Sequence, residues 1–181
     1  MDALAHELGI SKKTLYVHFD GKESLLAALF EDLGASLRAE MDAVLSSGTR
    51  TFAEKLCGVV AVAGAHIGRA SPALLRELQR HAPRQYARIE ELRREHIPQV
   101  FGRLIRDGIA AGSVHPEVDA AFAAEFWSHA IRGLMQPESL ERTGLSPRQT
   151  IDRAVHLFFS GLLSPAGRKD YENHRREHPA H

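Results

Sequence analysis

The segment at residues 8–19, with the sequence LGISKKTLYVHF, gathers side chains that could bind an anion. Ser11 directly precedes Lys12 and Lys13, and serine is a favoured N-cap, so a helix is predicted to begin at residue 12. The N-terminus of a helix carries partial positive charge and attracts phosphate groups. Two lysines in the first turn are unfavourable for the isolated helix but add to this charge. The whole pattern predicts an anionic partner, whereas the two lysines taken alone fit an ordinary solvated surface helix.

The residues around this segment predict a helix-turn-helix. A helix at about 2–8 ends at Gly9, and a second helix at about 12–18 follows a short turn. Apolar residues expected to pack the two helices together are Leu4, Ala5, Leu8, Ile10, Leu15 and Phe19. In a helix-turn-helix the second helix enters the major groove of DNA with its N-terminal residues against base edges. The candidates for base contacts are Lys12, Lys13 and Thr14, and those for positioning contacts with the DNA backbone are Ser11, Tyr16, His18 and Lys22.

The composition narrows the class of protein. The 181 residues contain 23 Lys and Arg and 23 Asp and Glu, so the formal net charge is zero and DNA binding would need a local cationic patch. The single cysteine, Cys57, excludes an internal disulfide and a four-cysteine zinc site. No basic segment followed by an apolar run opens the chain, and no apolar run approaches the roughly 20 residues of a membrane-spanning helix. We expect a soluble, cytoplasmic protein with no membrane partner.

Helical periodicity recurs along almost the whole chain, and no stretch alternates with the period of a strand, which predicts an all-α fold. Further helices are predicted at about 22–46, 51–69, 72–82, 84–112, 117–135 and 147–163. Asp20 stands three residues before Glu23, which predicts a capping box at the start of the long helix. Serine before proline at Ser71 and Ser146 predicts two more N-caps. The polar tail from Pro165 is predicted to be frayed.

The first 30 or so residues resemble a known family. The pattern Leu4-Ala5-x3-Gly9-Ile10-Ser11-x2-Thr14-Leu15-Tyr16-x-His18-Phe19-x2-Lys22-x2-Leu25 is similar to the signature of tetracycline-repressor-type (TetR family) transcriptional regulators. The rest of the chain resembles the family only in architecture. The resemblance implies a homodimer that binds palindromic operator DNA, represses transcription by family default, and is released by a small-molecule effector.

The same resemblance implies a division of the chain. A DNA-binding segment at 1–30 would continue in a connecting helix to about 46, followed by a ligand-binding and dimerisation domain at 47–164 and a flexible tail at 165–181. Members of the family carry a further helix before the motif, whereas this sequence begins where the second helix should start. Either an upstream stretch precedes Met1, which the intact motif favours, or the chain is a truncated member. A truncated member would bind ligand and dimerise without binding DNA.

Apolar stripes at helical spacing on the last two predicted helices are candidates for the dimer interface, which the family builds as a four-helix bundle. These candidates are Val118, Ala121, Phe122 and Glu125 on the first helix, and Ile151, Val155, Phe158 and Leu162 on the second. The alternative is that the stripes only serve the core of a single chain.

The resemblance also implies an effector cavity among the helices at 51–69, 84–112 and 117–135. The candidate lining residues are Cys57, His66, Tyr86, Phe101, Phe126, Trp127 and His129. They combine aromatic surface with a few polar groups, as small-molecule sites do, which predicts an apolar or aromatic effector. The alternative is that these residues are ordinary core. The arginine-rich run from Arg76 to Arg94, which is interleaved with glutamates, is predicted to be a solvated helical face with ion pairs four residues apart.

Neither a metal site nor an enzyme is favoured. His174 and His178 have the spacing of a helical metal pair and His181 follows, but no cysteine or carboxylate set completes a site. The motifs of nucleotide-binding enzymes, serine hydrolases and zinc proteases are all missing from the sequence. A metal centre built from His66, His129 and a carboxylate is the remaining enzymatic alternative. No cofactor is expected.

Overall fold

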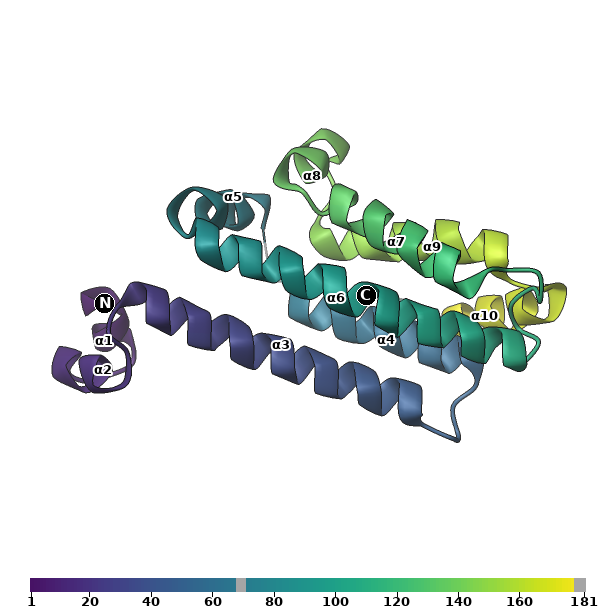
Figure 1. Ribbon diagram of the computed structural model, residues 1–181, viewed down its shortest axis with the longest axis horizontal. Helices are drawn as coiled ribbons and strands as arrows, with labels where there is room; N and C mark the ends of the chain where they lie inside the picture. Colours follow the sequence, from purple (N-terminus) through teal and green to yellow (C-terminus); the bar gives the residue numbers. More distant parts are fainter. Residues whose placement is uncertain (68–70, 178–181) are drawn as a thin grey trace.

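The computed structural model describes residues 1–67 and 71–177, and these residues form an all-helical protein (Figure 1). The helices in chain order are α1 (Asp2–Glu7), α2 (Lys12–His18), α3 (Lys22–Ser46), α4 (Phe52–Ile67), α5 (Pro72–His81), α6 (Pro83–Ala110), α7 (Ala120–Leu134), α8 (Pro137–Thr143), α9 (Pro147–Leu162) and α10 (Pro165–Glu177). The two short helices α1 and α2 lie at one end of the long helix α3, away from the bundle that the other helices form (Figure 1). The all-α prediction is confirmed.

Serine N-caps begin several of these helices, as the sequence predicts. The hydroxyl oxygen of Ser71 accepts a hydrogen bond of 3.1 Å from the backbone N–H of Leu74. At the start of α9 the Ser146 hydroxyl accepts from the N–H of Gln149, whose side-chain oxygen accepts in return from the N–H of Ser146. These bonds satisfy N–H groups that have no partner inside the helix, so they fix the residue at which each helix begins.

The predicted capping box at Asp20 and Glu23 is wrong by one residue. Gly21 occupies the N-cap position of α3, and its N–H donates a hydrogen bond of 3.2 Å to the Ser24 hydroxyl. The same hydroxyl donates to the Gly21 carbonyl oxygen at 3.0 Å. The third helical position therefore belongs to Ser24, because the turn that precedes α3 is one residue longer than the sequence spacing suggests.

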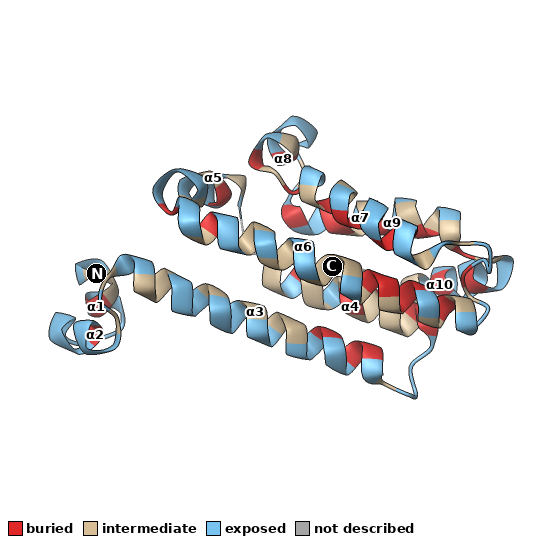
Figure 2. Cartoon of the chain, in the orientation of Figure 1, coloured by how far each residue is buried: buried red, intermediate tan, exposed pale blue. Residues whose placement is uncertain are grey.

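The hydrophobic core lies where α4, α6, α7 and α9 meet. Leu56, Leu104 and Phe159 have no solvent exposure. Aromatic rings connect the helices, with the Phe101 ring centroid 4.7 Å from that of Trp127 and 6.2 Å from that of Phe159. Buried residues cluster along these elements and at the C-terminal end of α3, whereas the N-terminal part of α3 carries none (Figure 2).

Two helices were not expected from the sequence. The short helix α8 follows α7 directly, and α10 occupies residues 165–177, where a frayed tail is predicted. The side chain of Tyr171 is only 4% exposed, and Arg175 extends from α10 to Asp152 of α9 at 3.4 Å. One buried aromatic residue therefore anchors α10 against the bundle although most of its residues are polar. The prediction of a frayed tail is corrected for residues 165–177.

Within the described residues, no single helix combines the length and apolarity needed to cross a membrane, although α4 and α5 taken together as a bent pair meet that test by length and composition.

The close approach of α10 to the loop after α6 gives a stability prediction. A methyl group on Gly167 would overlap the backbone carbonyl of Ser113. We expect Gly167→Ala to lower the free energy of unfolding by about 2 kcal/mol, since a backbone atom cannot move aside as a side chain can. Chemical denaturation measures the change.

Gly34→Ala is the matched control, because its added methyl group would meet only side-chain atoms, at 3.5 and 3.6 Å. It should raise the free energy of unfolding by up to about 1 kcal/mol through the higher helix propensity of alanine. Equal stability of the two variants would contradict the close packing of α10.

Candidate nucleic-acid interface

The two short N-terminal helices form the predicted helix-turn-helix. Gly9 has φ +65°, a left-handed conformation that favours glycine, and the N–H of Ile10 donates to the Ala5 carbonyl at 3.0 Å to close the turn. Only Ala5 and Leu15 are buried in the first 40 residues, at 5% and 3% exposure. These two side chains therefore hold α2 against α1.

All seven residues predicted to contact DNA are solvent-exposed. They are Ser11, Lys12, Lys13, Thr14, Tyr16, His18 and Lys22. The hydroxyl oxygen of Ser11 caps α2 by accepting from the Thr14 N–H at 3.0 Å, and it also lies 2.8 Å from the Thr14 hydroxyl. The capping role predicted for Ser11 is confirmed, and α2 presents a polar and cationic surface to solvent.

One carboxylate that the sequence reasoning missed lies on this surface. The Lys12 ammonium group is 2.7 Å from the carboxylate of Asp2, and both side chains are largely exposed. The hydrogen bond and charge of Lys12 lower the pKa of Asp2, and Asp2 in turn raises the pKa of Lys12. An exposed pair of this kind is weak in water and leaves Lys12 free to exchange partners, whereas Lys13 has no ion-pair partner among the described residues.

The apolar packing predicted for this segment is only partly present. Leu8 and Ile10 are 56% and 39% exposed, and Val17 is 73% exposed. The prediction that Leu8 and Ile10 pack inward is wrong for the described chain, because no described element lies over that side of α1 and α2. The segment consequently has little internal packing beyond Ala5 and Leu15.

The structure separates the predicted dimer residues into two groups. Ile151 and Val155 are buried at 5% and 1% exposure in the chain's own core, so they cannot meet a partner surface and that assignment is corrected. Ala121, Phe122 and Glu125 are exposed, whereas Val118, Phe158 and Leu162 are partly buried. The reason is that each helical stripe is wide enough to serve both the core and the outer surface.

An exposed apolar surface runs over α7 and α9. We call it the α7–α9 face, and it comprises Phe122, Phe126, Ala130, Phe158, Gly161 and Leu162. Phe122 is 71% exposed, and the ring of Phe126, itself 56% exposed, stacks on that of Phe158 with centroids 6.0 Å apart. Contiguous exposed aromatic surface is uncommon on a monomeric protein and is typical of an interaction surface.

The structure does not bring the seven predicted effector residues together. Tyr86, Phe101 and Trp127 are buried, and Cys57 and His66 are partly buried. Phe126 and His129 lie on the exposed side of α7, so their assignment to an internal cavity is corrected. The cause is the helical period, which turns adjacent residues by about 100°, so Trp127 faces the core while Phe126 faces solvent.

Two of these residues have specific roles that lie outside any cavity. His66 lies with its Nε2 2.8 Å from a Glu40 carboxylate oxygen and thereby connects α4 to α3. Burial raises the pKa of the Cys57 thiol to about 11, so the thiol is protonated at neutral pH and unreactive as a nucleophile.

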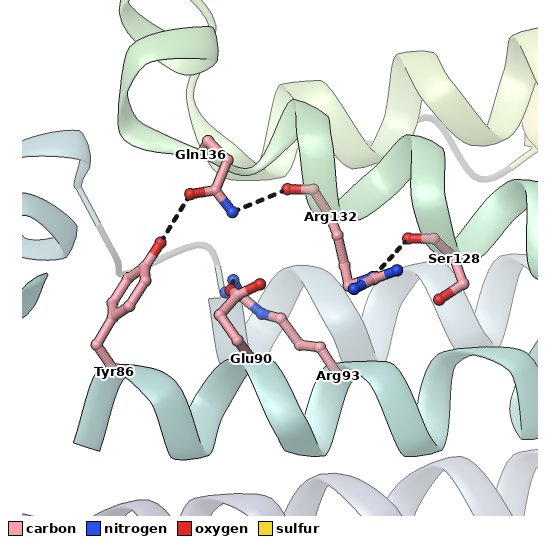
Figure 3. Close-up of polar contacts among 6 residues, drawn as sticks. All are labelled: Tyr86, Glu90, Arg93, Ser128, Arg132 and Gln136. Atoms are coloured by element: carbon pink, nitrogen blue, oxygen red, sulfur yellow. Dashed lines mark hydrogen bonds and ion pairs between the residues drawn. The ribbon is translucent and has the colours of Figure 1, made fainter. Parts of the chain in front are cut away.

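A polar cluster that the sequence did not predict lies between α6 and α7 (Figure 3). The Tyr86 hydroxyl donates to the side-chain oxygen of Gln136 at 3.0 Å, and the Gln136 amide donates to the Arg132 carbonyl at 3.3 Å. Glu90 and Arg93 form an ion pair of 2.6 Å whose side chains are only 20% and 16% exposed. The prediction of a solvated face is therefore wrong for this pair, since α7 covers part of α6.

The side chain of Trp127, on α7, contains a buried polar group without a hydrogen-bond partner among the described residues, and it faces Phe101 of α6. This group is the indole Nε1. A buried donor without a partner costs about 1–3 kcal/mol. Such a donor, with the Phe101 ring beside it, is suited to a ligand that brings a hydrogen-bond acceptor.

No group of three or more His, Cys, Asp or Glu side chains able to hold a metal ion occurs within residues 1–67 and 71–177. The spacing of His174 and His178, with His181 following, did not favour a metal site in the sequence analysis, and residues 178 and 181 lie outside the described residues.

Comparisons with known proteins add to this geometry. Residues 1–29 match the model of the bacterial regulatory proteins of the tetR family. The ketosteroid transcriptional regulator KstR2 of Mycobacterium tuberculosis has a similar fold, with a TM-score of 0.56 and 20% identity over 88% of this chain and 82% of that chain. The TetR family transcriptional regulator PfmR from Thermus thermophilus gives a TM-score of 0.53 and 22% identity over 86% and 82% of the two chains.

A comparison with curated proteins gave no match. The family signature covers the helix-turn-helix, and both solved structures share the helical architecture that follows it. Residues 1–29 therefore carry the signature of the tetR family of regulatory proteins, and the chain as a whole is similar in fold to two transcriptional regulators.

Proposed function

We propose that the protein is a homodimeric repressor that binds a palindromic operator through α2 and releases it when a small molecule binds the helical domain. The observation that carries this proposal is the exposed polar and cationic surface of α2, held at the far end of α3 from the core (Figure 1). A surface in that place can approach a duplex without obstruction by the bundle. No enzymatic step forms part of the proposal.

The proposed contacts follow from the position of each side chain on α2. Lys12, Lys13 and Thr14 lie in the first turn, which enters the major groove in a helix-turn-helix. Tyr16 and His18 lie further along, where their hydroxyl and imidazole groups suit phosphate oxygens. Asp2 competes with phosphate for Lys12, but this exposed pair is weak, so Lys12 can exchange the carboxylate for a phosphate when DNA binds.

The α7–α9 face is the proposed dimer interface. Its exposed phenylalanines supply the aromatic surface that stable interfaces bury, and Gly161 would have no atom within 4 Å of an added methyl group, so a partner helix could approach closely. A twofold axis through this face would relate two copies of α2 and require an operator with matching symmetry.

The proposed effector contacts lie between α6 and α7. Phe101 and Trp127 would contact the apolar part of the molecule, and the Trp127 indole would donate to an acceptor on it. Tyr86 and Gln136 would supply further hydrogen bonds. These residues replace Phe126 and His129 of the sequence prediction, which belong to the outer side of α7.

A second candidate is a family member that dimerises and binds ligand without binding DNA. The exposure of Leu8 and Ile10 and the pairing of Lys12 with Asp2 favour it, because a loosely packed recognition segment holds its contacts less firmly. Selection of binding sites from random-sequence duplex DNA distinguishes the two functions. Recovery of a palindromic sequence supports the operator-binding repressor, and recovery of none supports the second candidate.

The proposed recognition helix gives a prediction for Lys13. We expect Lys13→Ala to weaken binding to the selected operator by about tenfold and to reduce the slope of log affinity against log salt concentration by about one, since one phosphate contact is lost. Fluorescence anisotropy across a salt series measures both quantities. Lys169→Ala, an exposed change on α10, is the control and should leave both unchanged. Unchanged binding by the Lys13→Ala, Tyr16→Ala double variant would exclude α2 as the recognition helix.

The proposed dimer interface gives a prediction for the α7–α9 face. We expect Phe126→Asp to raise the dimer dissociation constant about 30-fold or more, because a buried aromatic residue would be replaced by a charge at the centre of the interface. Sedimentation velocity measures the dissociation constant. Leu74→Asp, at a leucine of α5 that is 48% exposed, is the matched control and should leave the dimer intact. Equal dissociation of both variants would place the interface elsewhere.

A further inference from the structure

The contact between Asp2 and Lys12 places an anion and a cation side by side at the start of the proposed recognition helix. The carboxylate belongs to the first residue of α1 and the ammonium group to the first residue of α2, and the two groups lie 2.7 Å apart. The side chains of Asp2 and Lys12 are 76% and 56% exposed. A duplex that meets the first turn of α2 therefore meets both charges.

The two groups have opposite hydrogen-bonding capacities. The hydrogen bond and charge of Lys12 lower the pKa of Asp2, so the carboxyl group is ionised at neutral pH and can only accept hydrogen bonds. The ammonium group of Lys12 can only donate them. A partner that satisfies both groups at once must therefore offer an acceptor and a donor at about the same spacing.

The base pairs of DNA offer such neighbouring atoms in the major groove. In a G·C pair they are the guanine O6 acceptor and the cytosine N4 donor, and in an A·T pair the thymine O4 acceptor and the adenine N6 donor. The hydrogen bond of the base pair itself joins these two atoms, and N–H···O hydrogen bonds are about 2.9 Å long. This spacing is close to the 2.7 Å between the carboxylate of Asp2 and the ammonium group of Lys12.

The groups that flank these atoms favour G·C over A·T. Guanine presents N7 beside O6, which gives the Lys12 ammonium group a second acceptor, whereas thymine presents its methyl group beside O4. Adenine N7 lies beside N6 and would repel the Asp2 carboxylate, whereas cytosine presents only its N4 donor. The better fit is therefore a G·C pair, with Lys12 on guanine and Asp2 on cytosine.

Phosphate groups can satisfy only one of the two side chains. When Lys12 exchanges the carboxylate for a phosphate, Asp2 is left without a cation beside a polyanion. When the contact opens against a G·C pair, both side chains gain a partner on the bases. This difference gives Asp2 an influence on sequence that a phosphate contact cannot have.

We propose that Asp2 is a specificity-determining residue, whose carboxylate accepts a hydrogen bond from a cytosine N4 amino group while Lys12 donates to the guanine of the same base pair. This inference rests on the proposed function, since it requires α2 to enter the major groove of an operator.

N4-methylcytosine tests the contact, because in the paired duplex its methyl group replaces the N4 hydrogen that faces the major groove and leaves guanine N7 and O6 unchanged. It is placed at each G·C pair of the selected operator, one position at a time in both half-sites. At one position we expect the unchanged protein to bind at least about tenfold more weakly, as measured by fluorescence anisotropy. At that position Asp2→Ala should lose less than about threefold, because it has no acceptor to lose.

Glu7→Ala is the matched control, because it removes an exposed carboxylate of the same helix that forms no ion pair with α2 in the described chain. It should respond to N4-methylcytosine as the unchanged protein does. An operator without a sensitive G·C pair, or an equal response of the Asp2→Ala variant, would overturn the role of Asp2 alone. Failure to select any operator would contradict the proposed function and remove this role with it.

Discussion

The structure depends on an uneven distribution of buried side chains along α3. Its C-terminal end contributes Met41, Val44 and Leu45 to the core, whereas its N-terminal part contributes none. The helix is therefore anchored at one end and carries α1 and α2 at the other, where Ala5 and Leu15 are the buried residues. This arrangement keeps the cationic surface of α2 clear of the bundle.

Local charge placement matters more here than total charge. The chain has no formal net charge, so attraction to a polyanion must come from a few groups at one end. The Asp2 carboxylate neutralises Lys12 in the unbound protein at 2.7 Å. A duplex would have to displace this contact, which costs little because both side chains are largely exposed to water. Specific contacts from α2 would then outweigh bulk attraction.

The sequence predicts most of the helices because their start signals are local. The hydroxyls of Ser71 and Ser146 accept hydrogen bonds from backbone N–H groups three residues away. These helix starts can therefore be predicted without knowing the tertiary structure. The missed features depend on tertiary contacts. One buried ring, Tyr171, orders α10, and the cover provided by α7 buries the Glu90–Arg93 pair. The exposed residues of the candidate DNA surface followed from the motif, but the Asp2 contact required coordinates.

The assignment of α7 residues shows why one helix can connect two functions. Its period places Trp127 inward and Phe126 outward, so adjacent residues belong to the proposed effector region and to the α7–α9 face. Phe158 touches both, with ring centroids 5.1 Å from Trp127 and 6.0 Å from Phe126. The Phe158 ring thus lies between the indole of Trp127, whose N–H has no partner among the described residues, and the exposed ring of Phe126. Phe158 therefore connects the proposed effector region to the proposed dimer interface through direct ring contacts.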